Sequence, residues 1–404
     1  MGLFNFFTQE IAIDLGTANT LIIHNDKVVV DEPSIVAFDR TTNKVIAIGR
    51  QAMQMEGKTH DNIRTVRPLK DGVIADFNAA EAMIKGMIRM LNGGKGWMFP
   101  SLRMVICIPS GITEVEKRAV RDSAEIAGAK EVYLIHEPMA AAVGIGIDVE
   151  EPMGNMIIDI GGGTTEIAVI ALSGIVCDQS IRIAGDEFTN DIMEALRRYH
   201  SLLIGERTAE QIKIQIGAAM KDIDNPPEDM AVNGRDLVTG IPKQIMVSYQ
   251  EIAEALDKSI FKIEEGILKA LETTPPELAS DIYRRGLYLT GGGALLKHLT
   301  QLVEYETGLD CRVGYPNEHL AKNETLPKNI YDDLKSPMYA TGIGLLIKGI
   351  EKAESEYQRE GTLKKGTDLA QDAAPKKSRG LFASILDGTK KFIKDDISDQ
   401  DFLK

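Results

Sequence analysis

The sequence is poor in cysteine and histidine, which limits the metal and redox chemistry that it can carry. Its 404 residues include 3 cysteines, at Cys107, Cys177 and Cys311, and 6 histidines. Neither residue type recurs at the spacing of a zinc site or of a disulfide framework. Cys107 lies in the apolar run VICI and is expected to be a buried thiol. Such cysteine usage is typical of a reducing cytosol.

Long apolar runs are also missing. No run approaches the ~20 residues that a helix needs to cross a bilayer. The start of the chain, MGLFNFFTQE, lacks the basic residues that open a secretory signal, and Phe6 stands where a myristoylation signal has Ser or Thr. We therefore expect neither a transmembrane helix nor a cleaved leader.

Basic residues are outnumbered by acidic ones, 46 to 60, which gives a formal net charge of −14. A chain of this charge repels the phosphate backbone of nucleic acids, so general nucleic-acid binding is not expected. The hydrophobic content of 44% is enough for two globular domains with cores of their own.

The sequence contains one α/β pattern that occurs twice. Strand-like runs such as IAIDLG, TLIIHN and KVVV open the chain, and strands that alternate with helices follow. A second meander begins at Ile157 and is followed by the same alternation. We therefore predict two related α/β halves. The predicted division is residues 9–150, with a small subdomain at about 33–70, then 151–336, a polar linker at 353–378 and a basic amphipathic tail at 379–404.

Two glycine-rich hairpins occupy the same place in the two halves. The first reads DLGTANT from Asp14, and the second reads DIGGGTTE from Asp159, 159 − 14 = 145 residues later. Turns of small residues expose consecutive backbone N–H groups, which bind anions, and a preceding Asp can hold Mg²⁺. A single hairpin of this kind is usually only a turn. Two copies, each with Asp in the same register, favour a phosphate clamp.

A third glycine cluster, Gly291, Gly292 and Gly293, follows the predicted strand GLYL and precedes a predicted helix. Backbone N–H groups at such a junction lie at the positive end of the helix dipole, which suits a phosphate or a nucleoside. The alternative is a tight packing turn. Beside the two hairpins, the cluster favours a nucleotide.

Glu137 directly precedes Pro138 at the start of a predicted helix. Proline in the first turn fixes the direction of the helix and with it the direction of the Glu side chain. A carboxylate placed in this way can orient and deprotonate a water for attack on a γ-phosphate. The alternative is a carboxylate that only stabilises the helix dipole.

The segment GERTAEQIKIQIG carries Glu210 and Lys213 on one face of a predicted helix. These two residues can contact the ribose and the base of a nucleotide, or they can form a surface ion pair. The pattern alone favours the ion pair.

These motifs together resemble the actin-like ATPase superfamily, which includes actin, the Hsp70 chaperones and the sugar kinases. Within it they are most similar to the MreB family of bacterial actin homologues, over about residues 9–352. The stretches that carry the resemblance are IAIDLGTANTLI, TVRPLKDGVIADF, ICIPSGITEVEKRAV, IHEPMAAAVGIG, DIGGGTTEIAVI, GERTAEQIK and LTGGGALL.

The resemblance implies a duplicated actin-like (RNase H-like) α/β fold. Two domains, each with a large and a small subdomain, would enclose a cleft for ATP and Mg²⁺, and a helix at 337–352 would complete the first domain. Asp14 and Asp159 would flank the metal. Glu137, Asp159 and Thr164 would be the catalytic residues, with Glu137 activating water. The implied nucleotide contacts are Gly16, Thr17, Ala18, Asn19, Gly161, Gly162, Gly163 and Thr164 at the phosphates, Gly185 and Asp186, Glu210 and Lys213 at ribose and base, and Gly291, Gly292 and Gly293 at the adenosine.

The resemblance also implies a function. It predicts a slow, cytoplasmic ATPase that polymerises into paired filaments on the inner face of the cytoplasmic membrane and organises cell-wall synthesis, with cell-wall elongation proteins as partners. The alternatives are a membrane-tethering actin homologue of the division machinery, similar to FtsA, and a monomeric ATPase of the Hsp70 or sugar-kinase type. Residues 33–70 look like the small subdomain that FtsA lacks, and too few residues follow 352 for a chaperone's substrate domain.

Three segments are predicted to contact the membrane. The first, at residues 1–8, is amphipathic if helical, and the second is an apolar loop that contains the single Trp of the chain. The third is the tail, which has an apolar and a charged helical face and carries six basic residues and one acidic residue between Lys376 and Lys394. The alternative for the loop is that it folds back onto the core, and the alternative for the tail is a helix docked on the protein's own surface or on a partner. The predicted membrane contacts are Leu3, Phe4, Phe6 and Phe7, then Trp97, Met98 and Phe99, and in the tail Leu381, Phe382, Ile385, Leu386, Phe392 and Ile393.

Overall fold

The computed structural model describes residues 8–24, 27–58, 61–91, 101–316, 336–352 and residue 355. The chain divides into a first unit, Met1–Glu351, and a second unit, Lys352–Lys404. Of the second unit, only Lys352 and Ser355 are described. Among the described residues, no helix is long and apolar enough to cross a membrane.

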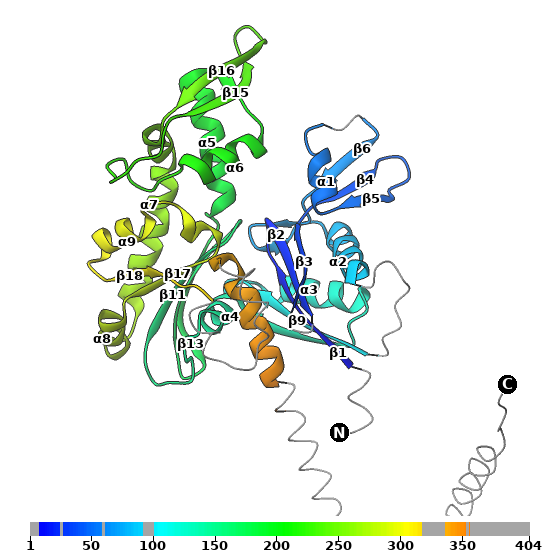
Figure 1. Cartoon of the computed structure of the whole chain (residues 1–404). Helices are drawn as coiled ribbons and strands as arrows, with labels where there is room; N and C mark the ends of the chain where they lie inside the picture. The colour runs from blue at the N-terminus through cyan, green and yellow to red at the C-terminus, as the bar shows by residue number, and fades with distance from the viewer. Residues whose placement is uncertain are drawn as a thin grey trace, which may run out of the picture. The chain divides into compact units, whose positions relative to one another are not determined.

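Two five-stranded sheets with the same strand plan form the centre of the two halves (Figure 1). In each sheet three consecutive strands form an antiparallel meander, and two later strands add in parallel to its first strand. The predicted duplication is confirmed. The first sheet has the order β10 (Glu131–His136), β9 (Ser101–Ile108), β1 (Thr8–Leu15), β2 (Asn19–His24) and β3 (Lys27–Pro33). The second has the order β18 (Cys311–Val313), β17 (Leu287–Thr290), β11 (Asn155–Ile160), β12 (Thr165–Ala171) and β13 (Gly174–Ile181).

Each half also carries a smaller sheet. The first half inserts the order β5-β4-β6 and the short α1, with a small core of its own that includes Ile35, Ala37 and Ala52. The second half inserts the order β14-β15-β16. The bounds are β4 (Val36–Asp39), β5 (Val45–Ile48), α1 (Arg50–Met55), β6 (Ile63–Val66), β14 (Leu202–Leu203), β15 (Met230–Asp236) and β16 (Pro242–Val247), and the hairpin β7 (Leu69–Lys70) and β8 (Val73–Ile74) lies between the first insert and α2.

Helices cover the sheets and begin where the sequence provides caps. Thr113 and Glu116 form a capping box at the start of α3, since the hydroxyl of Thr113 accepts from the N–H of Glu116 and the Glu116 carboxylate accepts from the N–H of Thr113. The helices are α2 (Phe77–Leu91), α3 (Glu114–Ile126), α4 (Glu137–Gly144), α5 (Gly185–His200), α6 (Glu206–Ile216), α7 (Tyr249–Thr273), α8 (Pro276–Arg285) and α9 (Leu299–Thr307), with the 3₁₀ turns η1 (Gly292–Leu295) and η2 (Pro337–Tyr339).

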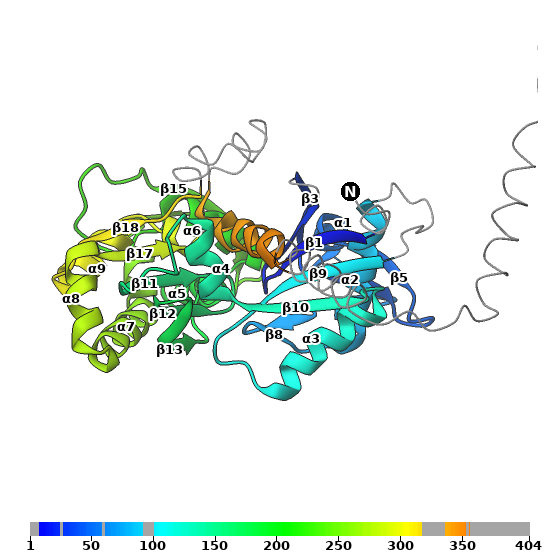
Figure 2. The same cartoon turned by 90° about the horizontal axis from the view of Figure 1, so that it is seen from below.

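Helix α4 and the helical residues 340–352 cross through small residues. A Cβ atom on Gly144 would lie 1.8 Å from the carbonyl oxygen of Ala340, and one on Gly344 would lie 1.7 Å from that of Ala140. Two glycines therefore set this close approach. Figure 2 shows both helices between the two large sheets, and α4 contributes Ala140 to the core of one sheet and Ala141 to that of the other.

One predicted junction differs in the structure. The third glycine cluster does not lead straight into an α-helix, because Gly292–Leu295 form one 3₁₀ turn and α9 begins only at Leu299. His298, with φ 62°, separates the two in a left-handed conformation. The backbone N–H groups at the cluster therefore belong to a 3₁₀ turn, and the predicted contribution of an α-helix dipole is wrong.

Candidate functional site

A cavity of about 1020 Å³ brings the predicted nucleotide contacts together. Its walls come from the β1–β2 turn, the β11–β12 turn, the start of α4, the facing parts of α5 and α6, and the third glycine cluster. Every residue predicted for the metal, the phosphates, the catalytic step, the ribose and base, and the adenosine turn lines this one cavity. The structure therefore brings these residues to one cavity from segments far apart in the chain.

The two glycine hairpins have equivalent registers. Asp14 pairs with Leu21 one residue before the last pair of its hairpin, and Asp159 pairs with Glu166 in the same position of the other. The turns also touch. A Cβ atom on Gly162 would lie 2.6 Å from the Cβ of Ala18, so a glycine is required where the two turns meet.

The third glycine cluster packs against the second hairpin. Gly291 has φ 78°, and a Cβ atom there would lie 2.4 Å from the Oδ1 atom of Asp159 and 2.4 Å from the carbonyl oxygen of Ile160. Both the conformation and the space therefore require glycine. The cluster is a tight packing turn and also lines the cavity. The two alternatives that the sequence left open therefore do not exclude each other.

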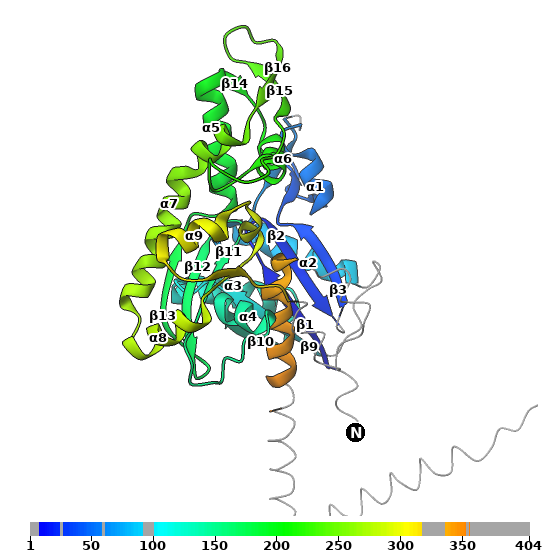
Figure 3. The ribbon, with the colours of Figure 1, turned by 60° about the vertical axis from the view of Figure 1, so that its left-hand side comes forward.

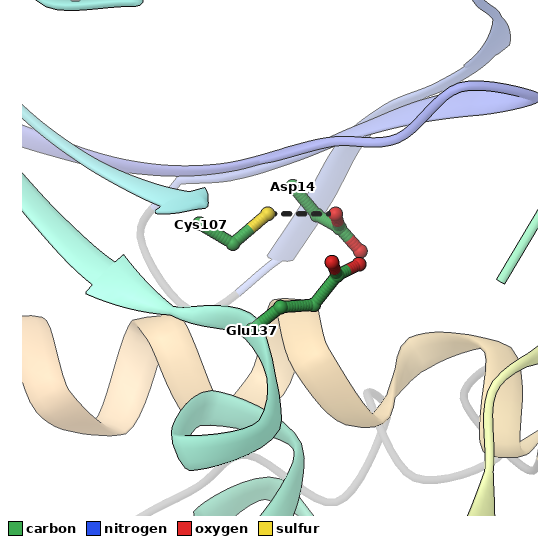
Figure 4. Close-up of side chains that lie close together, drawn as sticks. All are labelled: Asp14, Cys107 and Glu137. Atoms are coloured by element: carbon green, nitrogen blue, oxygen red, sulfur yellow. Dashed lines mark hydrogen bonds between the residues drawn. The ribbon is translucent and has the colours of Figure 1, made fainter. Parts of the chain in front are cut away.

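Two acidic side chains and a thiol that line the cavity lie close together (Figure 4). The Cys107 thiol donates to Oδ1 of Asp14 at 3.0 Å, and ligand atoms of Asp14, Cys107 and Glu137 all lie within 4.8 Å of one another. Asp159 stands beside this group and accepts a hydrogen bond from the Thr341 hydroxyl at 2.8 Å.

These carboxyl groups are held in an environment that disfavours their charge. Burial raises the pKa of Asp14 to about 6 and the pKa of Asp159 to about 7. Burial also raises the pKa of Glu137 well above its usual value, and repulsion from Asp159, Glu166 and Asp14 adds to this effect. A bound cation would relieve the repulsion, and carboxylate oxygens are the ligands that Mg²⁺ prefers. The residues present therefore fit a divalent cation.

The predicted metal pair and the observed cluster overlap in part. The sequence pointed to Asp14 and Asp159, whereas the residues with metal-ligand spacing are Asp14, Cys107 and Glu137. Burial and the neighbouring acids raise the pKa of the Cys107 thiol, so it stays protonated and is a poor ligand. The position of Cys107 beside Asp14 was not predicted from the sequence, because it depends on the pairing of β1 with β9, where Ile13 lies beside Ile106.

Glu210 and Lys213 form the ion pair that the pattern favoured, with 2.6 Å between Nζ and Oε2, and both also line the cavity. Lys213 donates to the carbonyl oxygen of Gly185 at 2.8 Å, and the hydroxyl of Thr189 donates to Glu210 at 2.7 Å. Burial raises the pKa of Asp186 to about 6, against the attraction of nearby cationic side chains. The ion pair therefore orients both side chains at the cavity wall.

All residues predicted to contact a membrane lie outside the described residues. This applies to the N-terminal segment with Leu3 and Phe7, to the loop with Trp97, Met98 and Phe99, and to the tail from Leu381 to Ile393.

Two sheets of the same strand plan, each presenting a glycine hairpin to one cavity, define an actin-like protein. Two known structures share this fold: MreB 5 of Spiroplasma citri bound to AMPPNP (TM-score 0.76, 36% identity, 88% of this chain and 99% of that chain) and a MamK double helical filament (0.66, 19%, 84% and 98%). At 19% identity the second shows the fold alone. The predicted fold class is confirmed.

The particular family follows from sequence comparison. The family model described as "MreB/Mbl protein" matches residues 8–322. The cell shape-determining protein Mbl of Bacillus subtilis (strain 168) is 49% identical over 301 residues, which are 74% of this chain and 89% of that protein. The cell shape-determining protein MreB of Escherichia coli (strain K12) is 48% identical over 313 residues, 76% and 89%. The chain belongs to the MreB/Mbl family, as its motifs predicted.

Proposed function

We propose that this protein is a cell shape-determining actin homologue that binds ATP with Mg²⁺, hydrolyses it slowly and assembles into filaments. The observation that carries the proposal is the meeting of two hairpin turns, one from each half, at one cavity floored by acidic groups. Two similar structures of MreB from Spiroplasma citri were solved with AMPPNP and with ADP, which supports a nucleotide in this cavity.

Different residues of the cavity would contact different parts of the bound nucleotide. Backbone N–H groups of the two hairpin turns would hold the phosphates, and the 3₁₀ turn at Gly291–Gly293 would border the adenosine. Glu210, held by Lys213 and Thr189, would accept hydrogen bonds from the ribose. Asp14 and Asp159 would hold the cation, which neutralises phosphate charge when it is bound.

We assign Glu137 the role of orienting the attacking water. It is the first residue of α4, and Pro138 and the buried small residues after it fix the start of that helix against the neighbouring core. Its carboxyl group lines the cavity with Asp14 and Asp159. A water held by this carboxylate in line with the terminal phosphate would lose its proton to Glu137 as it attacks.

The test is phosphate release by Glu137→Ala compared with the unchanged chain and with Glu150→Ala, a control at an exposed glutamate outside the cavity. Loss of an acid–base residue lowers the rate by about 10²–10⁴-fold. We expect this loss in Glu137→Ala with ATP binding retained, and no change in the control. Normal hydrolysis by Glu137→Ala would show that another group orients the water.

We further propose that the filaments lie on the inner face of the cytoplasmic membrane and organise cell-wall synthesis, together with cell-wall elongation proteins. The relatives' names and the three predicted membrane segments support this step. Co-sedimentation with ATP and anionic liposomes tests it: a filament that binds membrane enters the pellet, whereas a monomeric kinase or chaperone ATPase stays in the supernatant.

A further inference from the structure

A second cavity, of about 460 Å³, lies between α7, α9 and the segment that follows α6. None of the residues that line it lines the nucleotide cavity. Figure 3 shows α7 alongside α9 on the outer side of the second large sheet. A volume of this size is within the range of small-molecule sites. The cavity is therefore a separate place on the molecule at which a ligand can bind.

Glu264 of α7 stands in the wall of this cavity without a counter-charge. The residue is only 9% exposed, and within the described parts of the chain its carboxyl group has no hydrogen bond and no ion pair. The acidic groups whose charge acts on it are Glu306 of α9 and Asp257, about two turns earlier in α7, and both line the same cavity. Burial and these two acids raise the pKa of Glu264 to about 7.

Ionisation of a carboxyl group that is largely withdrawn from water and lies beside two further acids is unfavourable, and a bound cation offsets this cost. Lys221, a cationic side chain that lines the cavity, does not serve as the counter-charge of Glu264, because its ammonium group is paired with Glu254 at 3.3 Å. An unpartnered buried acid that faces a cavity therefore indicates a cationic ligand.

The residues that line the cavity indicate which kind of cation fits it. Within the described ranges, the group of residues with metal-ligand spacing is the one at Asp14, and the acids of this cavity are not part of it. Buried Ile260 and half-buried Leu302 give the cavity apolar walls, which a hydrated metal ion does not need. An ammonium group on a hydrocarbon chain uses both the acids and the walls.

We propose that this cavity binds an aliphatic ammonium group, with Glu264 as its buried counter-charge, Asp257 and Glu306 at the rim, and Ile260 and Leu302 along its carbon chain. The group can come from a free polyamine or from a lysine side chain of a second copy of this protein. The site goes beyond the proposed function, since it makes no use of the nucleotide cavity.

Calorimetric titration of the full chain with spermidine tests the first source, at a protein concentration below that of assembly. Spermidine should bind at one saturable site, and Glu264→Gln should weaken this binding by about tenfold or more, because a charge-assisted contact is lost. Glu265→Gln removes the same charge from the next residue of α7, which is exposed and outside the cavity, and should leave the affinity unchanged. Equal weakening in both variants would show general attraction to an acidic chain and overturn the site.

An assembly assay distinguishes a free polyamine from a lysine side chain of a second copy. If the ammonium group belongs to a second copy, Glu264→Gln should raise the protein concentration needed for sedimentable assembly, spermidine should inhibit assembly, and Glu265→Gln should do neither. If it is a free polyamine, Glu264→Gln should assemble normally in amine-free buffer. Spermidine that does not bind saturably, together with normal assembly of Glu264→Gln, would overturn the proposal. Unfolding curves confirm that the variants are folded, and Glu306→Gln on α9 provides a second variant for the same comparisons.

Discussion

Arg67 donates from Nη2 to Oε1 of Glu206 at 2.8 Å and so joins the two halves of the protein across the nucleotide cavity. Arg67 directly follows β6 of the first small sheet, and Glu206 opens α6 of the second half. The same guanidinium also reaches Glu56 at 3.2 Å, on its own side. All three residues line the cavity. The contact therefore links residues of the two halves that line the same cavity.

Breaking this contact should let a bound nucleotide leave faster. Glu206 is 47% exposed at its side chain, so the ion pair contributes no more than about 1 kcal/mol, which corresponds to about two- to fivefold in a rate. We expect Glu206→Gln to release a fluorescent ATP analogue faster by that factor in a stopped-flow displacement experiment.

The matched control is Glu56→Gln, which removes the partner on the same side and leaves the pair across the cavity intact. Its release rate should stay unchanged or fall, because Arg67 then has only Glu206 as a partner. Equal acceleration in both variants would mean that Arg67 acts through its own subdomain and not as a bridge between the halves.

Contact between the two hairpin turns makes a second prediction. A methyl group on Gly162 would lie 2.6 Å from the Cβ and 3.1 Å from the backbone nitrogen of Ala18. The turns must then move apart, and overpacking of this kind costs about 1–3 kcal/mol. We expect Gly162→Ala to weaken ATP binding by about tenfold or more, measured by equilibrium titration. Gly174→Ala is the control, because the nearest atom to a Cβ there lies at an ordinary 3.6 Å and the residue is outside the cavity; comparable losses in both would show that the contact with Ala18 is not the cause.

Local features of the fold were readable in the sequence because neighbouring residues determine them. Strand meanders follow alternating patterns, and the capping box at Thr113 needs only residues three apart. The duplicated hairpins were recognisable because the same Asp-apolar-Gly pattern recurs in the same register around Asp14 and Asp159. The third glycine cluster was misread because His298 and Leu296 interrupt the helix in a way that no periodicity reveals.

Residues brought in by distant pairing were not predictable. Cys107 reaches Asp14 through the β1–β9 register, and Thr341 reaches Asp159 from 182 residues away. Arg67 lies in a stretch that carried the family resemblance, yet its partner Glu206 is 139 residues later and belongs to the other half. In each case the signal is the packing of two elements, which the chain order does not contain.

The buried Glu264 should make stability depend on pH. Its pKa is raised from 4.5 to about 7 by burial and by Glu306 and Asp257, so between these pH values the folded chain binds the proton more tightly than the unfolded chain. The free energy of unfolding should therefore fall as the pH rises through this window. The other charged groups at the cavity are Lys221 and Asp222, and neither is changed in Glu264→Gln or in Glu265→Gln.

Glu264→Gln should remove this part of the pH dependence and be more stable than the unchanged chain above pH 7. Midpoints of urea unfolding, measured across the window for Glu264→Gln and for the exposed Glu265→Gln, provide the comparison. Parallel pH profiles for the unchanged chain and Glu264→Gln would show that the carboxyl group is solvated in the folded state.

The predicted membrane segments can be ranked because they use different forces. Between Lys376 and Lys394 the tail carries six basic residues and one acidic residue, 6 − 1 = 5 net positive charges, and each near-surface cation contributes about 1 kcal/mol to binding an anionic surface. Deleting residues 376–404 should therefore abolish the salt-sensitive part of binding to anionic liposomes, since salt screens such attraction. Deleting residues 1–8, or replacing Trp97, Met98 and Phe99 by Ser, should lower binding equally at low and high salt, because these segments are apolar and uncharged. A tail deletion that leaves both the amount bound and its salt dependence unchanged would assign the basic tail to a protein partner instead of the membrane.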